Sequence, residues 1–402
     1  MCKPTEVRIV GPLAPYAGGF CAELSAQGYT PLSAANQMRL MAHLSRWLDS
    51  RRIPSGKLSP DRVQQFLKAR RRAGYTAWLS ERGLAPLLGH LRQAGVVPKA
   101  VRPEPVTELD LLLERYGDYM VRERGLATTT IRRRKEVALR FLSVNLDPKA
   151  LDLHGLQAAY VTRFVLQECR GRHVGTAQLF ASELRSLLRF LYLEGLTPTQ
   201  LAGAVPPVAG WRHASLPRFL EPKQIQEILS SCDRRTAVGR RDYAILLLLS
   251  RLGLRAGEVT TLQLQDIDWV HGEIEIRGKG NRQDRLPLPQ DVGEAIVAYL
   301  CRGRPRSACR HLFLCSRAPH GPLGRTSVAV LVYGACTRAG VPRVNPHRLR
   351  HTAATQMLRQ GGTLPEISQV LRHRSLGTTA IYAKVDRKAL RVLALPWPGA
   401  KP

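Results

Sequence analysis

The sequence predicts a mostly α-helical protein with one small antiparallel β-sheet in its C-terminal half. Residues 241–252 are apolar on nearly every face, which predicts a buried central helix. Residues 267–288 form the predicted β portion, because Glu273–Ile276 alternate polar and apolar side chains before a glycine-containing turn. Apolar residues recur at helical spacing elsewhere along the chain, at residues 35–48, 111–122, 131–142 and 176–193.

The composition indicates a polyanionic partner. Among 402 residues, 61 are Lys or Arg and 31 are Asp or Glu, which gives a formal net charge of +30. An excess of this size favours nucleic acid over an anionic membrane surface. No apolar run approaches the length of a membrane-spanning helix, and the start of the chain lacks the apolar stretch of a signal peptide. We therefore expect a cytoplasmic protein without a membrane role.

The metal-binding side chains form no strong motif. Eight cysteines are scattered along the chain without a C-x-x-C pair, so reduced and mostly buried thiols are expected. One loose cluster leaves a zinc site open as an alternative: Cys301, Cys309, His311 and Cys315. The sequence has no clustered Asp/Glu set that would hold magnesium, and we expect no cofactor.

Residues 1–103 are predicted to form a basic helical domain, with an additional DNA-binding role. Residues 51–103 contain twelve Lys or Arg against two acids, whereas residues 1–50 are nearly balanced. A short helix at residues 63–67 runs into a basic cluster that is either a solvated patch or a contact to the DNA backbone. This cluster is Arg70, Arg71 and Arg72.

Residues 104–201 are predicted to form a compact helical domain. Residues 111–122 are amphipathic, and the threonines at 128–130 offer N-caps for the helix at 131–142. In the helix at 176–193, leucines face the core. Basic residues on these helices are expected to contact DNA: Arg132, Arg133, Arg134, Lys135, Arg185 and Arg189.

Residues 202–217 are predicted to be an interdomain linker, since they are rich in glycine and proline and lack an apolar period. Residues 218–402 then form the last domain. It begins with a short amphipathic helix at residues 222–229, which the buried helix at residues 241–252 follows.

The C-terminal domain contains a set of side chains that suits a phosphodiester. Pro346 favours a helix start, so His347 and Arg350 share one helix face. Tyr382 lies one turn into a later predicted helix. Arginine forks onto phosphate oxygens, histidine exchanges protons, and a tyrosine oxygen can attack phosphorus.

These motifs resemble those of the tyrosine recombinases, the family of phage integrases and Xer-type proteins. The family carries H-x-L-R-H-T, as residues 347–352 do, and a histidine nine residues before a tyrosine, as His373 and Tyr382 are. Residues 254–259 match its first arginine motif, and residues 278–282 match its catalytic-lysine hairpin.

The resemblance implies an architecture and a function. Residues 104–201 resemble the core-binding, SAM-like domain of the family, and residues 218–402 resemble its catalytic domain; together these form a C-shaped clamp on double-stranded DNA. The implied protein is a bacterial site-specific recombinase or integrase that works through a 3′-phosphotyrosyl intermediate, for integration or transposition. The implied assembly is a homo-tetramer on two duplexes, alone or with related recombinases, docked through a tail helix at residues 386–395.

The resemblance also implies a metal-independent reaction centre. Tyr382 is the nucleophile, and the other roles are as follows: Arg255 and Arg350 clamp the phosphate oxygens, Lys279 protonates the leaving 5′-oxygen, His347 accepts the Tyr382 proton, and His373 donates to the phosphate.

Some residues of these motifs have alternative interpretations. Glu258 orients the neighbouring basic groups or forms a surface ion pair, and Lys279 without the family match would be an ordinary solvated turn residue. His351 is expected to pack behind the site. Arg372 departs from the family, which usually has glycine there, and its guanidinium either contacts DNA or crowds the turn before His373.

Two other functions use the same motifs. A type IB topoisomerase shares the chemistry but relaxes DNA instead of exchanging strands. A noncatalytic DNA-binding regulator on a decayed integrase fold would have lost one of the six reaction-centre residues, and all six are present.

Overall fold

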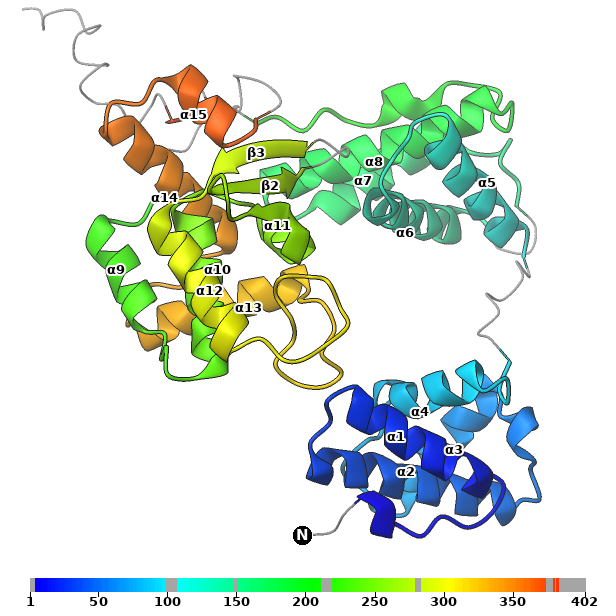
Figure 1. The fold of residues 1–402 in the computed structure, drawn as a ribbon. Coiled ribbons are helices and arrows are strands. Elements are labelled where there is room, and N and C mark those ends of the chain that lie inside the picture. Colours follow the sequence, from blue (N-terminus) through cyan, green and yellow to red (C-terminus); the bar gives the residue numbers. More distant parts are fainter. Residues whose placement is uncertain are drawn as a thin grey trace, which may run out of the picture. The chain divides into compact units, whose positions relative to one another are not determined.

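The computed structural model of the protein describes residues 4–98, 107–147, 151–210, 219–278 and 283–373, together with 379, 381 and 382. Figure 1 shows the helices of the N-terminal, middle and C-terminal parts of these residues. The buried apolar side chains of each part form a hydrophobic core of their own. The described residues are mostly helical and contain one three-stranded antiparallel sheet, which confirms the predicted fold class. The predicted clamp concerns how these parts close on DNA and stays a prediction.

Four helices build the N-terminal part. They are α1 (Ala17–Ala26), α2 (Pro31–Asp49), α3 (Pro60–Arg72) and α4 (Glu81–Gln93), with 3-10 turns at Pro4–Glu6, Ala14–Tyr16 and Ser55–Lys57. Thr30 caps α2 by accepting a hydrogen bond from the Ser33 amide. The helical segments predicted at residues 35–48 and 63–67 lie within α2 and α3, so both are confirmed.

The middle part contains four further helices. They are α5 (Glu108–Arg122), α6 (Thr128–Asn145), α7 (Ala158–Cys169) and α8 (Val174–Leu193), followed by a 3-10 turn at Leu201–Ala204. Thr107 and Asp110 form a capping box at the start of α5. Helix α6 begins at Thr128 without a side-chain cap, so the predicted threonine caps are wrong; the threonines occupy the first turn because Ala127 is the last extended residue.

The chain after α8 stays with the middle part for longer than predicted. Ala202 and Val205 are buried in the middle core, and Arg185 Nη2 donates to the Val205 oxygen at 3.0 Å. The first residues of the predicted linker therefore pack on this part through Ala202, Val205 and Val208, whereas residues 209 and 210 are exposed. Residues 211–217 lie outside the described residues.

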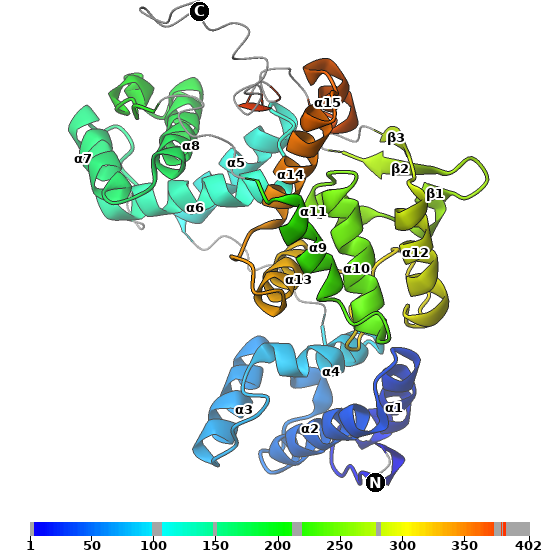
Figure 2. The same cartoon turned by 90° about the vertical axis from the view of Figure 1, so that its left-hand side faces the viewer.

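The C-terminal part surrounds one buried helix. Its helices are α9 (Pro222–Ser230), α10 (Ala237–Ser250), α11 (Ala256–Thr261), α12 (Gln290–Arg302), α13 (Arg325–Arg338), α14 (Pro346–Arg359) and α15 (Leu364–Val370), with a 3-10 turn at Leu264–Asp266. Helices α9, α12, α13 and α14 all contact α10, and Figure 2 shows α9 beside it. Residues Ala244–Leu249 are almost completely buried, which confirms the predicted central helix.

The antiparallel sheet lies in the same part. Strands β1 (Ile267–Asp268), β2 (Glu273–Arg277) and β3 (Gln283–Pro287) pair in that order. Ile274 faces Leu286 across the β2–β3 pair, and both side chains are buried. The predicted hairpin is confirmed in its strands, whereas its turn at residues 279–282 lies outside the described residues.

The described residues form neither a membrane-spanning helix nor a cluster of metal ligands. Among them, no helix is long and apolar enough to cross a membrane. Within the same ranges, no three His, Cys, Asp or Glu side chains gather as metal ligands would; Cys309 Sγ and His311 Nδ1 lie 3.4 Å apart. The seven described cysteines are free thiols, but only Cys232 and Cys336 of these are buried, so the expectation of mostly buried thiols is wrong.

Candidate active site

A glycine turn after α10 places Arg255 beside Arg350. Gly253 has a φ of +59°, and a Cβ at this position would lie 2.6 Å from Leu371 Cδ2, so the turn favours glycine. The Gly253 oxygen accepts a hydrogen bond from Arg350 Nη1 at 2.5 Å. Arg255 follows as the N-cap of α11. The first and second arginine motifs therefore meet at this turn.

Glu258 holds Arg255 from within α11. Its Oε1 accepts from Arg255 Nη1 at 2.6 Å, and its Oε2 accepts from the Arg255 amide at 2.8 Å. Burial raises the pKa of Glu258, but the charge of Arg372 and the hydrogen bonds from Arg255 outweigh it and keep the pKa below its ordinary value. The Glu258 side chain is 5% exposed, which excludes the alternative of a surface ion pair.

Arg350 is the most enclosed charge of the site. Its side chain is completely buried, and Nη2 donates to the Leu371 oxygen while Nη1 holds Gly253. Its Nε is buried without a hydrogen-bond partner. Burial, reinforced by the charge of Arg255, lowers the pKa of Arg350 to about 10, so the guanidinium is still charged at neutral pH. Two neighbouring guanidinium groups would be stabilised by a bound anion.

Helix α14 carries the two histidines of the H-x-L-R-H-T match, His347 and His351. Asn345 caps it by accepting from the Arg348 amide at 2.9 Å, and Pro346 is its first residue, as predicted. The His347 and His351 rings follow each other at 4.4 Å between centroids. Burial first, and then the charges of Arg350 and Arg255, lower the pKa of His347.

The Tyr382 hydroxyl contacts His351, not His347. The Tyr382 oxygen lies 2.7 Å from His351 Nδ1. Burial, together with His347 and nearby arginines, lowers the pKa of His351 to about 4, so the ring is neutral at neutral pH and its Nδ1 can accept the phenol hydrogen. Burial raises the pKa of Tyr382 to about 12, because the opposing charges of Arg350 and Arg255 are weaker. The described contact of Tyr382 is therefore with the histidine one turn further along the helix face than His347, and the catalytic roles of both histidines stay predictions.

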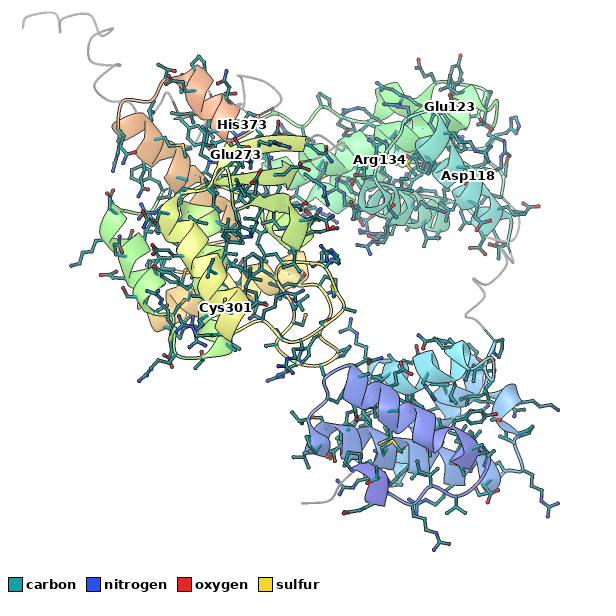
Figure 3. All side chains as sticks on the ribbon, in the orientation of Figure 1. Asp118, Glu123, Arg134, Glu273, Cys301 and His373 are labelled. Atoms are coloured by element: carbon teal, nitrogen blue, oxygen red, sulfur yellow. The ribbon has the colours of Figure 1, made fainter. Side chains whose placement is uncertain are left out.

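His373 completes the described cluster. Its ring is nearly parallel to that of Tyr382, 6.4 Å away, and its Nδ1 lies 2.7 Å from Thr379 Oγ1. Figure 3 labels its side chain just beyond α15. Burial, together with Arg350 and Arg255, lowers the pKa of His373 to about 4. The imidazole is therefore neutral and still carries one N–H for donation to an anion.

Arg372 does not point outward as a DNA contact would. Its side chain is 5% exposed, so it does not reach outward, and Nη2 donates to Glu258 Oε2 at 2.8 Å. The amides of Arg372 and His373 donate to the Gln369 and Ser368 oxygens and close the end of α15. Sequence reasoning missed this ion pair, because residues 114 positions apart carry no local signal of contact.

Two predicted elements of the site lie outside the described residues. One is Lys279 in the turn between β2 and β3. The other is the tail helix at residues 386–395. Their predicted roles stay predictions.

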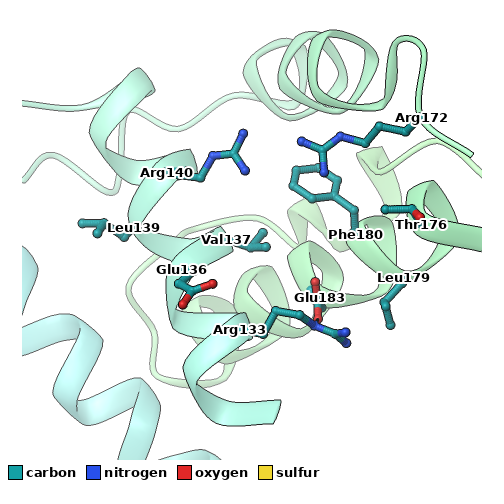
Figure 4. A pocket seen from close by; sticks show the side chains of 10 residues that line it. All are labelled: Arg133, Glu136, Val137, Leu139, Arg140, Arg172, Thr176, Leu179, Phe180 and Glu183. Carbon is teal, nitrogen blue, oxygen red and sulfur yellow. Dashed lines mark hydrogen bonds and ion pairs between the residues drawn. The ribbon is translucent and has the colours of Figure 1, made fainter. Parts of the chain in front are cut away.

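The basic residues of the middle part differ in how exposed they are. Arg132, Arg133 and Arg189 are exposed, and Arg132 Nε lies 3.9 Å from Glu136 Oε1. Arg133 pairs with the buried Glu183, and Figure 4 shows the two side chains pointing toward each other in a pocket of about 400 Å³ between α6 and α8. The other predicted contacts are partly buried: Arg134, Lys135 and Arg185. We therefore expect the exposed arginines to be the stronger candidates for an external anion.

The three arginines at the end of α3 also differ in their exposure to solvent. Arg71 and Arg72 are exposed, but Arg70 is only 6% exposed. Its guanidinium lies 4.2 Å from the Tyr75 ring centroid, and Nη2 donates to the Ala77 oxygen at 3.2 Å. The prediction of a DNA contact is wrong for Arg70 in this structure, because its helical position turns it inward to hold the following loop.

The sequence comparisons identify the class of protein. The profile of the phage integrase family matches residues 218–389. A putative integrase/recombinase, y4rA of Sinorhizobium fredii (strain NBRC 101917 / NGR234), is 39% identical over 99% of this chain and 97% of its own length. The tyrosine recombinase XerD of Mycobacterium tuberculosis (strain H37Rv) is 34% identical over 73% of this chain and 98% of its own length. The chain belongs to the phage integrase family, the tyrosine recombinases.

A comparison of folds agrees with this assignment. The crystal structure of the XerH site-specific recombinase bound to a palindromic difH substrate matches with a TM-score of 0.55 at 17% identity. The match covers 73% of this chain and 97% of XerH. At this identity the match establishes a shared fold, and the sequence relatives carry the family assignment.

Proposed function

We propose that this chain is a site-specific DNA recombinase that cleaves and rejoins DNA through a phosphotyrosyl bond to Tyr382. The observation that carries the proposal is the Tyr382 hydroxyl, 2.7 Å from the neutral His351. The net charge of +30 supports DNA as the substrate. The names of y4rA, an integrase/recombinase, and XerD, a tyrosine recombinase, support the same reaction class.

In the proposed reaction, the Tyr382 oxygen attacks the scissile phosphorus and the bond to the 5′-oxygen breaks. The products are a 3′-phosphotyrosyl bond and a free 5′-hydroxyl, and the reverse attack rejoins the strand without ATP. Arg255 and Arg350 stabilise the charge on the nonbridging oxygens, and His373 donates its remaining N–H. Because Tyr382 is 1% exposed, DNA binding must open the residues around it before attack.

The central experiment is covalent trapping on a nicked suicide substrate, from which the cleaved 5′ fragment diffuses away. The full-length protein should form a covalent adduct, and peptide mapping should place the DNA on Tyr382. The same yield is expected with a metal chelator, because the guanidinium groups of Arg255 and Arg350 supply the positive charge that a metal ion would otherwise supply. Absence of any adduct on DNA carrying the cognate site would exclude the proposed reaction. Relaxation of supercoiled DNA without joint products would indicate a topoisomerase instead.

His351 is proposed to accept the Tyr382 proton, in place of the predicted His347. His351→Ala should lower the single-turnover cleavage rate at neutral pH by about 10²-fold or more. Its residual rate should rise about tenfold per pH unit, because hydroxide must then deprotonate a phenol whose pKa is about 12. The wild-type rate should stay flat from about pH 6 upward, since His351, with a pKa of about 4, is already neutral.

His347→Ala is the matched control for this prediction, because it removes the neighbouring ring from the same helix face. It should keep the flat pH dependence even if its rate is lower. If His347→Ala gave the sloping profile and His351→Ala the flat one, the proton would pass to His347 as the sequence suggested.

The N-terminal part is proposed to be an additional DNA-contacting domain. Lys68, Arg71 and Arg72 are exposed on α3. Replacing all three with Gln should lower the log–log slope of DNA affinity against salt by about 2 to 3, because each lost phosphate contact removes about 0.9. A salt series on the full-length protein measures the slope. An unchanged slope combined with loss of synapsis would assign this surface to protein contacts.

A homo-tetramer on two duplexes is the proposed assembly, alone or with related recombinases. Strand exchange needs two cut duplexes held together, which is the chemical reason for four active sites. Bacterial cytoplasm is the proposed location, consistent with a DNA substrate.

A further inference from the structure

Helix α15 ends in a turn that ordinarily takes glycine. The His373 amide donates to the Ser368 oxygen at 3.0 Å, and the Arg372 amide donates to the Gln369 oxygen at 2.9 Å. These two bonds define a Schellman motif, whose residue after the C-cap adopts a left-handed conformation. That residue is Arg372, with a φ of +53°. Residues other than glycine rarely adopt this backbone conformation. We therefore expect contacts of the Arg372 side chain to stabilise the turn.

The Arg372 side chain reaches into the centre of the site. Its Nη2 donates to Glu258 Oε2 at 2.8 Å, and Nη1 donates to the Val370 oxygen at 3.0 Å. Both partners of the ion pair are 5% exposed. The same Glu258 carboxylate accepts two hydrogen bonds from Arg255. One buried carboxylate thus joins two guanidinium groups that would otherwise repel each other.

The turn at the end of α15 does not by itself explain the Arg372 side chain. Glycine alone would satisfy the left-handed backbone, so the turn itself does not require a guanidinium. A contact to DNA is also excluded in this conformation by the burial of the side chain. What remains is that Arg372 and Arg255 pair with the same carboxylate, that of Glu258. The Arg255 side chain is 38% exposed and needs a fixed partner to keep one orientation.

We propose that Arg372 is a positioning residue for strand cleavage, acting through Glu258 to fix the orientation of Arg255. The inference rests on the proposed function, because it assigns Arg255 to the scissile phosphate. Arg372 Nη2 donates to Glu258 Oε2, and Arg255 Nη1 donates to Glu258 Oε1. The other N–H groups of the Arg255 guanidinium stay available for the phosphate. The pKa of Glu258, held below its ordinary value by Arg372 and Arg255, agrees with a permanently ionised bridge.

The test is single-turnover cleavage of a nicked suicide substrate by the full-length protein and its Arg372→Gly variant. Glycine fits the backbone turn, so the melting temperature should stay close to that of the wild type. DNA affinity should change less than about threefold, whereas the cleavage rate should fall at least tenfold, because only the orientation of Arg255 is lost. Arg372→Lys should recover part of the rate, since an ammonium group can still pair with Glu258.

A double-mutant cycle with Arg255→Ala identifies the path of the effect. If Arg372 acts through Arg255, the double variant should cleave no more slowly than Arg255→Ala alone. If the fold loss of the cleavage rate in the double variant equalled the product of the two single losses, the residues would act independently and the inference would be overturned. Equal losses of affinity and cleavage in Arg372→Gly, or a wild-type cleavage rate, would also overturn it.

The control variant is Arg241→Gln, which removes another buried arginine–carboxylate pair. Arg241 Nη2 lies 2.8 Å from Asp242 Oδ1, near the end of α10 remote from Gly253. This variant should lower the melting temperature without a change in the cleavage rate of bound DNA. The wild-type adduct is the internal reference: its absence would refute the proposed function, whereas its presence with a normal Arg372→Gly rate refutes only this inference.

Discussion

Tyr382→Phe is expected to bind DNA with wild-type affinity and to form no covalent adduct. The substitution removes only the oxygen that attacks phosphorus and leaves the ring in its buried place. Loss of a nucleophile lowers a rate by a factor on the order of 10⁵ to 10⁶, so the adduct should fall below detection. A suicide-substrate gel and a binding titration on the same DNA measure the two quantities.

Two other tyrosines sharpen this experiment. Tyr333 is 39% exposed on α13, and Tyr333→Phe should give the wild-type adduct yield. Tyr299 is 1% exposed, and its hydroxyl accepts a hydrogen bond from the Leu314 amide at 3.2 Å, which gives it a structural role. Full adduct formation by Tyr382→Phe would contradict the assignment and move the search to these two residues.

Features with a local cause were predictable from the sequence. Helix α14 begins at Pro346 because Asn345 caps it, and both residues are neighbours in the chain. The burial of α10 follows from its nearly continuous apolar composition, and the β2–β3 pair from alternation around a turn. In each case the signal and the structure occupy the same few residues.

Features that depend on tertiary contacts were not predictable. The direction in which Arg70 points depends on the loop that folds back over α3, so a run of three arginines could not separate it from Arg71 and Arg72. The contact of Tyr382 with His351 depends on how a distant segment packs on α14. The Arg372–Glu258 pair joins two helix termini, and only the folded chain brings them together.

Lys279→Ala is expected to fail on ordinary DNA yet to cleave DNA that has sulfur at the 5′-bridging position. An alkoxide is too basic to leave without a proton, whereas a thiolate, whose conjugate acid has a pKa near 8.5, leaves unaided. Loss of a general acid costs about 10² to 10⁴ in rate, and the sulfur substrate should remove most of that difference. Parallel single-turnover assays on the oxygen and sulfur substrates measure the rescue.

The position of Lys279 between two described strands provides the control. Arg285 on β3 is another basic residue of the same hairpin, and its exposed side chain lies 3.7 Å from Glu273. Arg285→Ala removes a positive charge from the hairpin without removing the proposed acid. The ratio of its cleavage rates on the sulfur and oxygen substrates should therefore match that of the wild type. If sulfur rescued neither variant, Lys279 would serve DNA binding or geometry. If sulfur rescued both equally, the effect would reflect a faster intrinsic reaction of the thiolate and not a missing proton donor.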